Sequence, residues 1–384
     1  SSVPPRTVVV RSNRFWGDMY PYARGNCPTE ILRNGLVDLA SDGQSGTWEK
    51  DGTGPIFIRA GGGMAQGKRR FEFGSTGVTN LFLEGTFEGS TTTSIDLKDQ
   101  SWLVRPATAS GPLTIPSSFN INTKVRFLVE DVPDAPVDLT LTGGIAYGWY
   151  PRDAFYKLGA GVLRLTGSSS YGGGGALEQG EGTTVVRGGT LLVDNDRGSG
   201  TGNSLVNVEA GAVLGGTGRI GGLTNTVSHW SGNTGTGENT RVQASGSADA
   251  QAVIAPGTID AADGSHLVGT LTVGVKELHH PVTFGDHSTL RVAAGAKTAD
   301  KLEVHGTVDV SATGTVLELS VAGRTFGGTF TILEADEITG TFETVVKPNS
   351  SWKISYESET ESGETTVKRI VLTVPPAGTV IVVR

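Results

Sequence analysis

The stretch from Lys157 to Gly222 constrains the fold most, because it consists of short alternating apolar runs that glycine interrupts. The runs are VLRLTG, TTVVRGGTLLV, SLVNVEAG and AVLGGTGRIGG. Side chains alternate with period two in a strand, and glycine adopts the positive φ of tight turns, so each run predicts one short strand and one corner. A unit of this size cannot bury its own apolar side chains. A series of such units therefore predicts a stacked solenoid, which is a parallel β-helix.

The composition of the whole chain agrees with a solenoid. Glycine supplies 57 of the 384 residues, and only 36% of the residues are hydrophobic. A high glycine content and a low hydrophobic content are typical of a protein with many corners and a thin core. The regular recurrence of Val, Leu and Ile pairs argues against disorder. We expect an all-β protein in which one elongated body replaces several globular domains.

Charge and cysteine content exclude several classes of partner. The formal net charge is -8, and the 31 basic residues are dispersed, which argues against nucleic acid and anionic membranes as partners. The single cysteine, Cys27, cannot form an internal disulfide. No apolar run reaches the ~20 residues of a membrane-spanning helix, so we expect no membrane insertion of this chain. We recognise no signal peptide at the start of this sequence and expect any export signal to have been removed.

The pattern of apolar runs and turn residues divides the chain into four segments. Residues 1–40 predict an N-terminal strand and cap, in which TEILRNGLVDLA predicts a short helix with Ile31, Leu32, Leu36 and Leu39 near one face. Residues 41–156 predict the first coils, and residues 157–344 predict further coils with a lateral loop at 225–251. Residues 345–384 predict a C-terminal hairpin cap, built from SWKISYES and TTVKRIVLTV, and a terminal strand.

From Lys157 onward the order of motifs resembles the autotransporter-associated β-strand repeat of bacterial passenger proteins. The motifs are KLGAGVLRLTG, SYGGG, TTVVRGGTLLV, EAGAVLGGTGRIGG and IAPG. The resemblance is strong over residues 157–374, and residues 41–156 match only in general style. It implies a right-handed single-stranded parallel β-helix, with caps at both ends, that is exported to a bacterial surface. The large C-terminal barrel of a true autotransporter is absent, and the chain ends in TVIVVR, so we expect a released passenger or a surface protein exported by another route.

These observations give one main functional hypothesis and two alternatives. The main hypothesis is a non-catalytic, extracellular structural or adhesive β-helix that serves as a stalk, fibre subunit or adhesin, with itself or host and matrix glycans as partners. The first alternative is a carbohydrate-active β-helix, a polysaccharide lyase or glycoside hydrolase. That alternative requires two or more carboxylates that converge within ~5–10 Å on one strand face. The second is a trimeric phage-type spike.

No catalytic, metal or cofactor site emerges from the sequence. Asp194, Asn195 and Asp196 form an acidic turn that an Asx-rich corner explains better than a calcium site. His266, His279, His280, His287 and Asp286 resemble metal ligands, but their spacing matches no known motif and Pro281 interrupts it. We expect no cofactor and no enzymatic activity.

Aromatic residues and the two ends of the chain are the remaining candidates for interaction. Trp48, Trp149 and Trp230, together with Trp102 and Tyr150, are candidates for stacking on sugars, although a role in the core or caps is favoured.

The segments PPRTVVVR near the N-terminus and PPAGTVIVVR at the C-terminus have similar sequences. In each, two prolines precede a run rich in β-branched residues that ends in arginine. Such strands can pair with another chain and build a head-to-tail fibre, or pair within their own chain. The predicted interaction residues are Thr7, Val8, Val9, Val10, Thr379, Val380, Ile381, Val382 and Val383.

Overall fold

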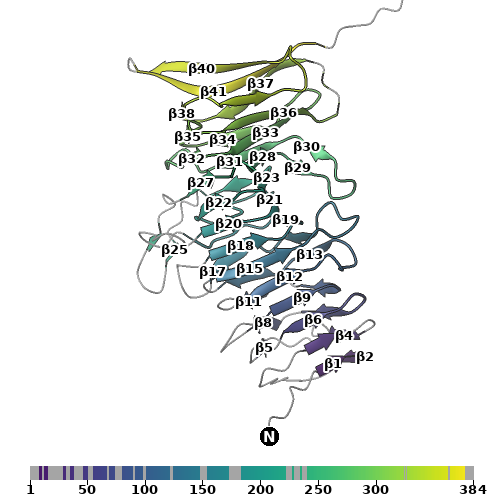
Figure 1. Ribbon diagram of the computed structural model, residues 1–384. Helices are drawn as coiled ribbons and strands as arrows, with labels where there is room; N and C mark the ends of the chain where they lie inside the picture. Colours follow the sequence, from purple (N-terminus) through teal and green to yellow (C-terminus); the bar gives the residue numbers. More distant parts are fainter. Residues whose placement is uncertain are drawn as a thin grey trace, which may run out of the picture.

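The computed structural model describes most of the chain from residue 55 onward and five strands before it. The described ranges are 8–10, 13–15, 29–31, 35–38, 46–50, 55–66, 69–73, 80–89, 91–97, 101–121, 124–147, 154–172, 183–221, 227–228, 234–235, 240–323, 325, 327–361 and 364–376. All regular elements in these ranges are strands, and nearly all of them pair in parallel between successive coils. The protein is therefore an all-β parallel solenoid, as the glycine-interrupted runs predict (Figure 1).

Three walls enclose the core. The long wall is one 13-stranded sheet. Its strands are β1 (Val8–Val10), β3 (Thr29–Ile31), β6 (Ile56–Ile58), β9 (Asn80–Leu83), β12 (Trp102–Arg105), β15 (Lys124–Val129), β18 (Ala154–Leu158), β20 (Thr183–Val186), β22 (Leu205–Val208), β27 (Arg241–Ala244), β32 (Val282–Phe284), β35 (Thr307–Asp309) and β38 (Glu337–Thr339).

The second wall consists of a four-stranded and a nine-stranded sheet. The first contains β2 (Asn13–Phe15), β4 (Gly35–Asp38), β7 (Gly63–Ala65) and β10 (Thr86–Glu88). The second contains β13 (Leu113–Ile115), β16 (Leu139–Leu141), β19 (Val162–Leu165), β21 (Gly189–Val193), β23 (Ala212–Gly216), β28 (Ala252–Pro256), β33 (Ser288–Ala294), β36 (Val316–Val321) and β39 (Thr344–Val346).

The third wall consists of a five-stranded and a six-stranded sheet. The first contains β5 (Gly46–Lys50), β8 (Arg69–Phe73), β11 (Ser94–Leu97), β14 (Ser118–Ile121) and β17 (Ile145–Tyr147). The second contains β24 (Arg219–Ile220), β31 (Thr270–Val273), β34 (Lys301–Val304), β37 (Gly328–Glu334), β41 (Glu364–Val374) and β40 (Lys353–Glu361). Where all three strands of a coil are described, the chain passes through the long, second and third walls in that order. The coils of β1 and β2, of β18 and β19, and of β20 and β21 have no third-wall strand among the described residues.

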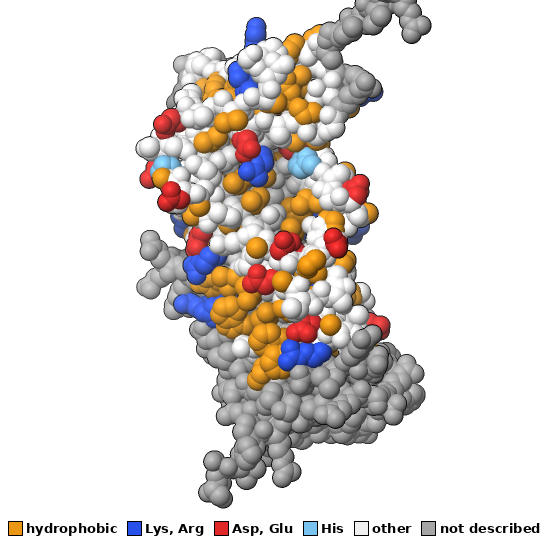
Figure 2. All heavy atoms as spheres, turned by 45° about the vertical axis from the view of Figure 1, so that its right-hand side comes forward, with side chains coloured by type: hydrophobic (Ala, Val, Ile, Leu, Met, Phe, Trp, Pro, Cys, Tyr) orange, Lys and Arg blue, Asp and Glu red, His pale blue; other side chains and the backbone are white. Residues whose placement is uncertain are grey.

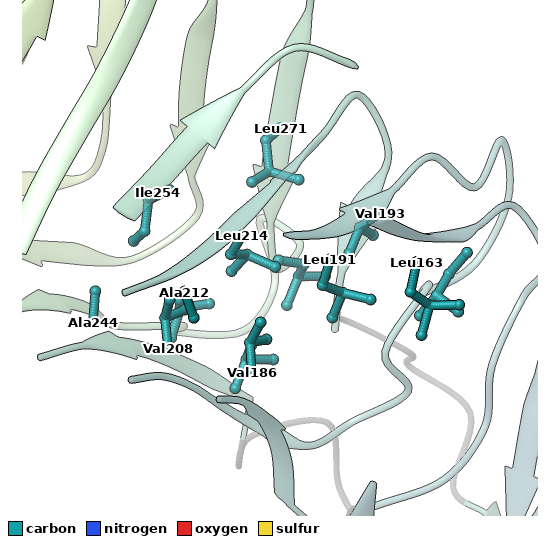
Figure 3. Close-up of a cluster of buried hydrophobic side chains, with 14 of the residues drawn as sticks. Leu163, Val186, Leu191, Val193, Val208, Ala212, Leu214, Ala244, Ile254 and Leu271 are labelled. Carbon is teal, nitrogen blue, oxygen red and sulfur yellow. The ribbon is translucent and has the colours of Figure 1, made fainter. Parts of the chain in front are cut away.

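The core is one apolar cluster that extends from Ile56 to Val374. Equivalent residues of successive coils are register partners, so inward side chains form rows along the axis. One row on the second wall contains Leu191, Leu214, Ile254, Leu290 and Leu317, all of which are buried. Figure 3 shows part of this packing, with Leu191, Leu214 and Ile254 facing Val186, Val208 and Ala244 of the long wall across the interior. The alternation read from the sequence therefore places the correct residues inside.

The helix predicted in residues 29–40 is wrong. This segment forms β3 and β4, which pair in parallel with β6 and β7 of the next coil. Ile31 lies on the three-residue strand β3 and Leu36 on the four-residue strand β4, so their helical spacing is a coincidence. Leu32 and Leu39 lie outside the described residues. Pairing with neighbouring coils outweighs the local helical preference of the segment.

The lateral excursion is shorter than the predicted loop at 225–251. Within it, β25 (Val227–Ser228) and β26 (Thr234–Gly235) pair antiparallel. The chain has returned to the long wall at β27, where Val242 and Ala244 are buried. A second lateral hairpin, which the sequence did not reveal, contains β29 (Thr258–Ile259) and β30 (His266–Leu267).

The hairpin predicted near the C-terminus is present. β40 pairs antiparallel with β41, and β41 pairs antiparallel with β37. Phe342 and Trp352, which flank β39 in the chain, are both buried at this end of the core. The final residues, including Thr379 to Val383, lie outside the described part of the chain.

Candidate functional site

The strand predicted at the N-terminus forms and pairs within its own chain. Val8, Val9 and Val10 in β1 lie beside residues 29–31 of β3. β1 is the first strand of the long wall, and its other edge has no strand partner among the described residues. Thr7, Thr379, Val380, Ile381, Val382 and Val383 lie outside the described residues, so contact between chains through these ends stays a prediction.

The structure describes only some of the tryptophans proposed for sugar stacking. Trp149 and Trp230 lie outside the described residues, and Trp48 is described only as part of the β5 backbone. Trp102 lies on β12 and is half-buried on the outside of the long wall. The Arg126 guanidinium carbon lies 5.3 Å from the centroid of the Trp102 ring.

This contact belongs to a longer stack on the outside of the long wall. The Arg126 guanidinium carbon also lies 5.8 Å from the Tyr156 ring, and that of Arg187 lies 5.7 Å from the same ring. Indole, guanidinium, phenol and guanidinium thus follow one another along the axis, which is a favourable cation–π arrangement. Because guanidinium groups cover the ring faces, these rings hold successive coils together and offer little free surface to a sugar.

An apolar row accompanies this stack on the same half of the long wall. Phe57, Phe82, Val104, Leu128 and Leu158 are register partners in successive coils, and all point outward. The Phe57 and Phe82 rings stack with their centroids 4.6 Å apart. Figure 2 shows hydrophobic side chains gathered on the wall next to the grey N-terminal part, whereas the surface further along is mixed.

A polar cleft on the third wall brings carboxylates together. It has a volume of about 460 Å³ and is lined by Lys276, Glu303, Val304, His305, Glu334, Ala335, Asp336, Glu359 and Lys368. Glu303 and Glu334 are register partners on β34 and β37. Lys301 Nζ donates to Oε2 of Glu303 at 3.1 Å and to Oε2 of Glu334 at 2.5 Å, so these two oxygens are at most 5.6 Å apart. The convergence of carboxylates that a carbohydrate-active β-helix requires is therefore present.

The electrostatics of the cleft are those of an ion-pair network. The hydrogen bond from Lys301, opposed by partial burial and aided by the charges of Lys301, Arg369 and His305, lowers the pKa of Glu334 below its usual value. Burial opposes the charge of Lys301, but hydrogen bonds and charge from Glu334 and Glu303 outweigh it and raise the lysine pKa. A general acid of a glycosidase needs a carboxyl with a raised pKa. Glu334 has the opposite shift and is held as an anion.

Two cations are buried where the long wall turns into the second wall. Lys157 Nζ donates to the carbonyl oxygens of Leu158, Gly159 and Gly188 at 2.9, 2.9 and 3.0 Å. Burial lowers the pKa of Lys157 to about 8, against the charges of Asp138 and Glu130. Lys157 opens the repeat-like stretch, and the structure shows that it binds the carbonyls of two successive corners.

Arg105 occupies the same corner two coils earlier. It donates to the carbonyls of Leu83, at 2.5 Å, and Gly111. Burial lowers the pKa of Arg105 to about 10, against the charge of Asp138. Asp138 lies between the two cations along the axis and accepts the backbone N–H groups of Val132 and Val162 at 2.6 and 2.5 Å. The corner is thus a structural charge network that the hydrophobic pattern alone did not reveal.

In the acidic turn, the side chains of Asp194 and Asn195 are engaged by hydrogen bonds, whereas Asp196 is exposed and lies 3.9 Å from Arg197. Asp194 accepts the N–H of Thr217 at 2.9 Å and the hydroxyl of Thr258 at 2.5 Å, and it lies 2.9 Å from Arg164 Nε. Asn195 accepts the N–H of Arg219 and donates to the carbonyls of Arg197 and Gly198. These contacts fit the Asx-rich corner.

The histidines that resemble metal ligands do not converge. His266 Nε2 lies 2.8 Å from the buried carboxylate of Asp300, and His279 Nε2 lies 3.3 Å from the Thr307 hydroxyl. His280 is fully buried, and burial, despite the Thr240 carbonyl near Nδ1, lowers its pKa. Among the described residues, no three His, Cys, Asp or Glu side chains are grouped as a metal site.

The lateral hairpin β29–β30 is fastened across the second wall. Arg164 on β19 donates to Thr258 Oγ1 at 3.2 Å and to the carbonyl of Ile259, and Asp300 holds His266 on the opposite strand. Beside the hairpin lies a groove of about 290 Å³ with a floor of Leu192, Val213, Gly215 and Ala255. Gly215 comes from the glycine-rich AVLGGTGRIGG run and Ala255 from the IAPG motif, but no sequence signal indicated the hairpin that borders the groove.

No helix in the described part of the chain has the length and apolar character needed to span a bilayer. No protein-family model matches the chain, and no curated protein matches it.

Proposed function

We propose that this protein is a non-catalytic, extracellular structural or adhesive rod of a bacterial surface. The observation that carries the proposal is the single apolar core from Ile56 to Val374, which the stacked parallel sheets enclose. A solenoid in which each coil contacts its neighbours through rows of apolar side chains resists bending and presents long lateral surfaces. Such a body suits a stalk, a fibre subunit or an adhesin with glycans as targets.

The contacts on the outer surfaces support a structural role. The stack from Trp102 to Arg187 and the ion pairs around Lys301 each join successive coils. In both, the side chains contact other side chains of the same protein. The resemblance to the passenger repeat supports export to the cell surface.

A binding experiment separates adhesion from catalysis. The purified chain is applied to arrays of bacterial, host and matrix polysaccharides, and the same polysaccharides are assayed for new reducing ends and unsaturated products. We expect binding without release of either product. Sustained turnover at a rate proportional to protein concentration would overturn the non-catalytic assignment.

The carbohydrate-active alternative is kept because of Glu303 and Glu334. If the cleft were catalytic, Glu303→Gln and Glu334→Gln would each abolish turnover, whereas Glu318→Gln, which breaks only the exposed pair with Arg291, would retain it. The lowered pKa of Glu334 argues for the structural role of this pair.

A further inference from the structure

The outer face of the long wall carries an apolar column that runs across β6, β9, β12, β15 and β18. Its members are register partners in successive coils: Phe57, Phe82, Val104, Leu128 and Leu158. All of them except Val104 are partly exposed, and Figure 2 shows hydrophobic side chains gathered on this part of the wall. A continuous exposed apolar area of this kind marks an interaction surface.

A second column lies beside the first, two positions earlier on the same strands. It consists of Trp102, Arg126 and Tyr156, which are stacked on one another and partly exposed. Tryptophan, tyrosine and arginine are enriched at the centre of protein interfaces. The position of this column is polar at Asn207 on β22 and Gln243 on β27, so the aromatic part of the wall ends before these strands. We refer to the apolar column and the stacked column together as the contact face.

Unpaired charges of opposite sign flank the contact face on one coil. Lys124, at the start of β15, is exposed. Glu130 and Asp131 follow the other end of the same strand, where Glu130 is partly exposed and Asp131 is exposed. None of these three side chains forms an ion pair with another described residue, whereas Glu84 is paired with Arg59 at 2.9 Å. The contact face is therefore positive on one side and negative on the other.

We propose that the contact face binds the contact face of a second copy of this chain, in a lateral dimer whose two-fold axis runs parallel to the solenoid axis. This contact rests on the proposed structural role and assigns the rod a partner along its side. The axis lays the apolar column of each copy, with Leu128 near its middle, on the stacked column of the other copy. It also places Lys124 of each copy opposite Glu130 of the other.

The partner is a second copy because the contact face is complementary to itself. A two-fold axis along the solenoid exchanges the two sides of the face, so the positive side meets the negative side twice, as in an isologous interface. A two-fold axis across the solenoid would instead bring the two lysine sides together, and the repulsion between like charges disfavours that arrangement. With the axis along the solenoid, both rods point in one direction, which suits two rods that project from the same cell surface.

The size of the contact face predicts a reversible dimer. Five strands about 4.8 Å apart and about six residues wide, at about 3.3 Å per residue, cover roughly 480 Å², so two copies bury roughly 1,000 Å². Specific protein interfaces begin near this area, and those at the lower end are weak. An isologous contact closes on itself and gives a dimer without further growth. We therefore expect a dimer that dissociates on dilution.

The experiment measures association of the full chain from about 1 to about 300 µM, by sedimentation velocity and small-angle scattering. We expect a monomer–dimer equilibrium in which the dimer is wider than the monomer and equally long, since the rods lie side by side. Leu128→Lys places two lysines within the apolar columns and should weaken association by about a hundredfold. Val321→Lys is the matched control, because Val321 is 44% exposed on β36 in the second wall. It should associate like the parent chain.

A charge exchange tests the direction of the two-fold axis. Lys124→Glu places a glutamate opposite Glu130 of the second copy, and the axis applies the substitution twice, so association should weaken by about tenfold. Glu130→Lys should weaken it by bringing lysines together. The double variant Lys124→Glu/Glu130→Lys restores opposite charges and should recover most of the association.

Arg241→Glu is the control for the charge exchange. Arg241 is exposed on β27, at the same edge of the long wall as Lys124 but beyond the contact face, so its reversal should leave association unchanged. A double variant that associates more weakly than both single variants overturns the two-fold axis along the solenoid. So does a Lys124→Glu variant that associates as tightly as the parent chain.

Other outcomes decide whether the contact face is the interface. A parent chain that stays monomeric up to about 300 µM overturns the proposal, as does a dimer about twice as long as the monomer. Thermal unfolding of Leu128→Lys is measured in parallel. If this variant does not fold, the charge variants at exposed positions decide the question.

Glycan binding is measured separately on the parent chain and on monomeric variants. A parent chain that binds glycans but never dimerises refutes the dimer alone, whereas one that dimerises but binds no glycan refutes adhesion alone. Retained glycan binding by a monomeric variant would show that the two surfaces are separate.

Discussion

At the scale of single residues, the buried ammonium group of Lys157 adds polar contacts between coils to those of the apolar core. Its ammonium group donates hydrogen bonds to three carbonyl oxygens at two successive corners. Lys157→Met keeps the volume of the side chain and removes these three hydrogen bonds. We expect a loss of about 2 kcal/mol in the free energy of unfolding, measured by urea denaturation. Lys276→Met, at an exposed position, is the control and should change stability by less than about 0.5 kcal/mol. Equal stabilities of the two variants would refute this role of Lys157.

His280 gives the fold a pH dependence whose sign is fixed by its burial. Burial lowers its pKa below that of an unfolded histidine, so the folded protein keeps the ring neutral while the unfolded chain takes up a proton. Stability from this group is therefore complete above about pH 6.5, the ordinary histidine value, and decreases as the pH falls through the unfolded and then the folded pKa. We expect the melting temperature to fall between pH 7.5 and 5.5, and His280→Asn to reduce this slope.

The adjacent histidine is the control for this titration. His279 is exposed and adds only a smaller charge contribution to the lowered pKa of His280, so His279→Asn should change the pH slope of the melting temperature less than His280→Asn does. If both substitutions had the same effect on the slope, burial of His280 would not be its cause.

At the scale of elements, the β29–β30 hairpin depends on a partly buried ion pair. Arg164 and Asp194 are only 12% and 10% exposed and hold Thr258 at the base of the hairpin. Arg164→Met should release the hairpin and increase proteolytic cleavage between residues 259 and 266 by about tenfold, since about 1.4 kcal/mol corresponds to that ratio of open states. Arg291→Met, on the same wall, breaks a pair that is 44% and 37% exposed and should have no such effect. Equal cleavage of both variants would contradict the clamp.

The elements that the sequence predicted well are those with a strict period of two. The runs around Leu163 and Leu191 form strands with the expected faces inside, because alternation and glycine corners act locally. Residues 29–40 were misassigned because the same apolar residues fit a helical period, and only pairing with β1 and β6 decides between the two structures.

The candidate sites were less predictable than the fold. Glu303 and Glu334 are far apart in the sequence and meet because their strands stack in register, which depends on the exact length of each coil. The same holds for His266 and Asp300, and for the hairpin that crosses coils to reach Arg164. The stack of Trp102, Arg126 and Tyr156 requires the register of three coils. Contacts between coils of variable length leave no local signal in a single sequence.

At the scale of the whole molecule, the outer surface of the long wall changes along the axis while the fold does not. One outward row contains Trp102, Arg126, Tyr156 and Val185, and it continues as Asn207, Gln243, Thr283 and Asp309. The polar half shows that the wall forms without aromatic residues outside. The aromatic and basic half therefore adds contacts between coils that the polar half does not have.

The repeated register predicts that a whole coil can be removed. Leu81 and Leu103 are register partners on β9 and β12, so deletion of residues 81–102 joins Asn80 to Leu103 and places β12 beside β6 in the register that β9 had. All remaining side chains keep their inward or outward direction, because partners share a face. We expect a folded rod, shorter by about 4.8 Å in small-angle scattering, with a sharp thermal transition.

Deletion of one residue fewer is the matched control for this experiment. Removing residues 81–101 leaves Trp102 in the position of Leu81, which turns Leu103 outward and a large indole inward. The coil can recover its faces only by forcing the extra residue into a corner, so we expect a lower melting temperature and a broader transition than for the longer deletion. If the shorter deletion were the more stable of the two, register between coils would not determine the stability of this solenoid.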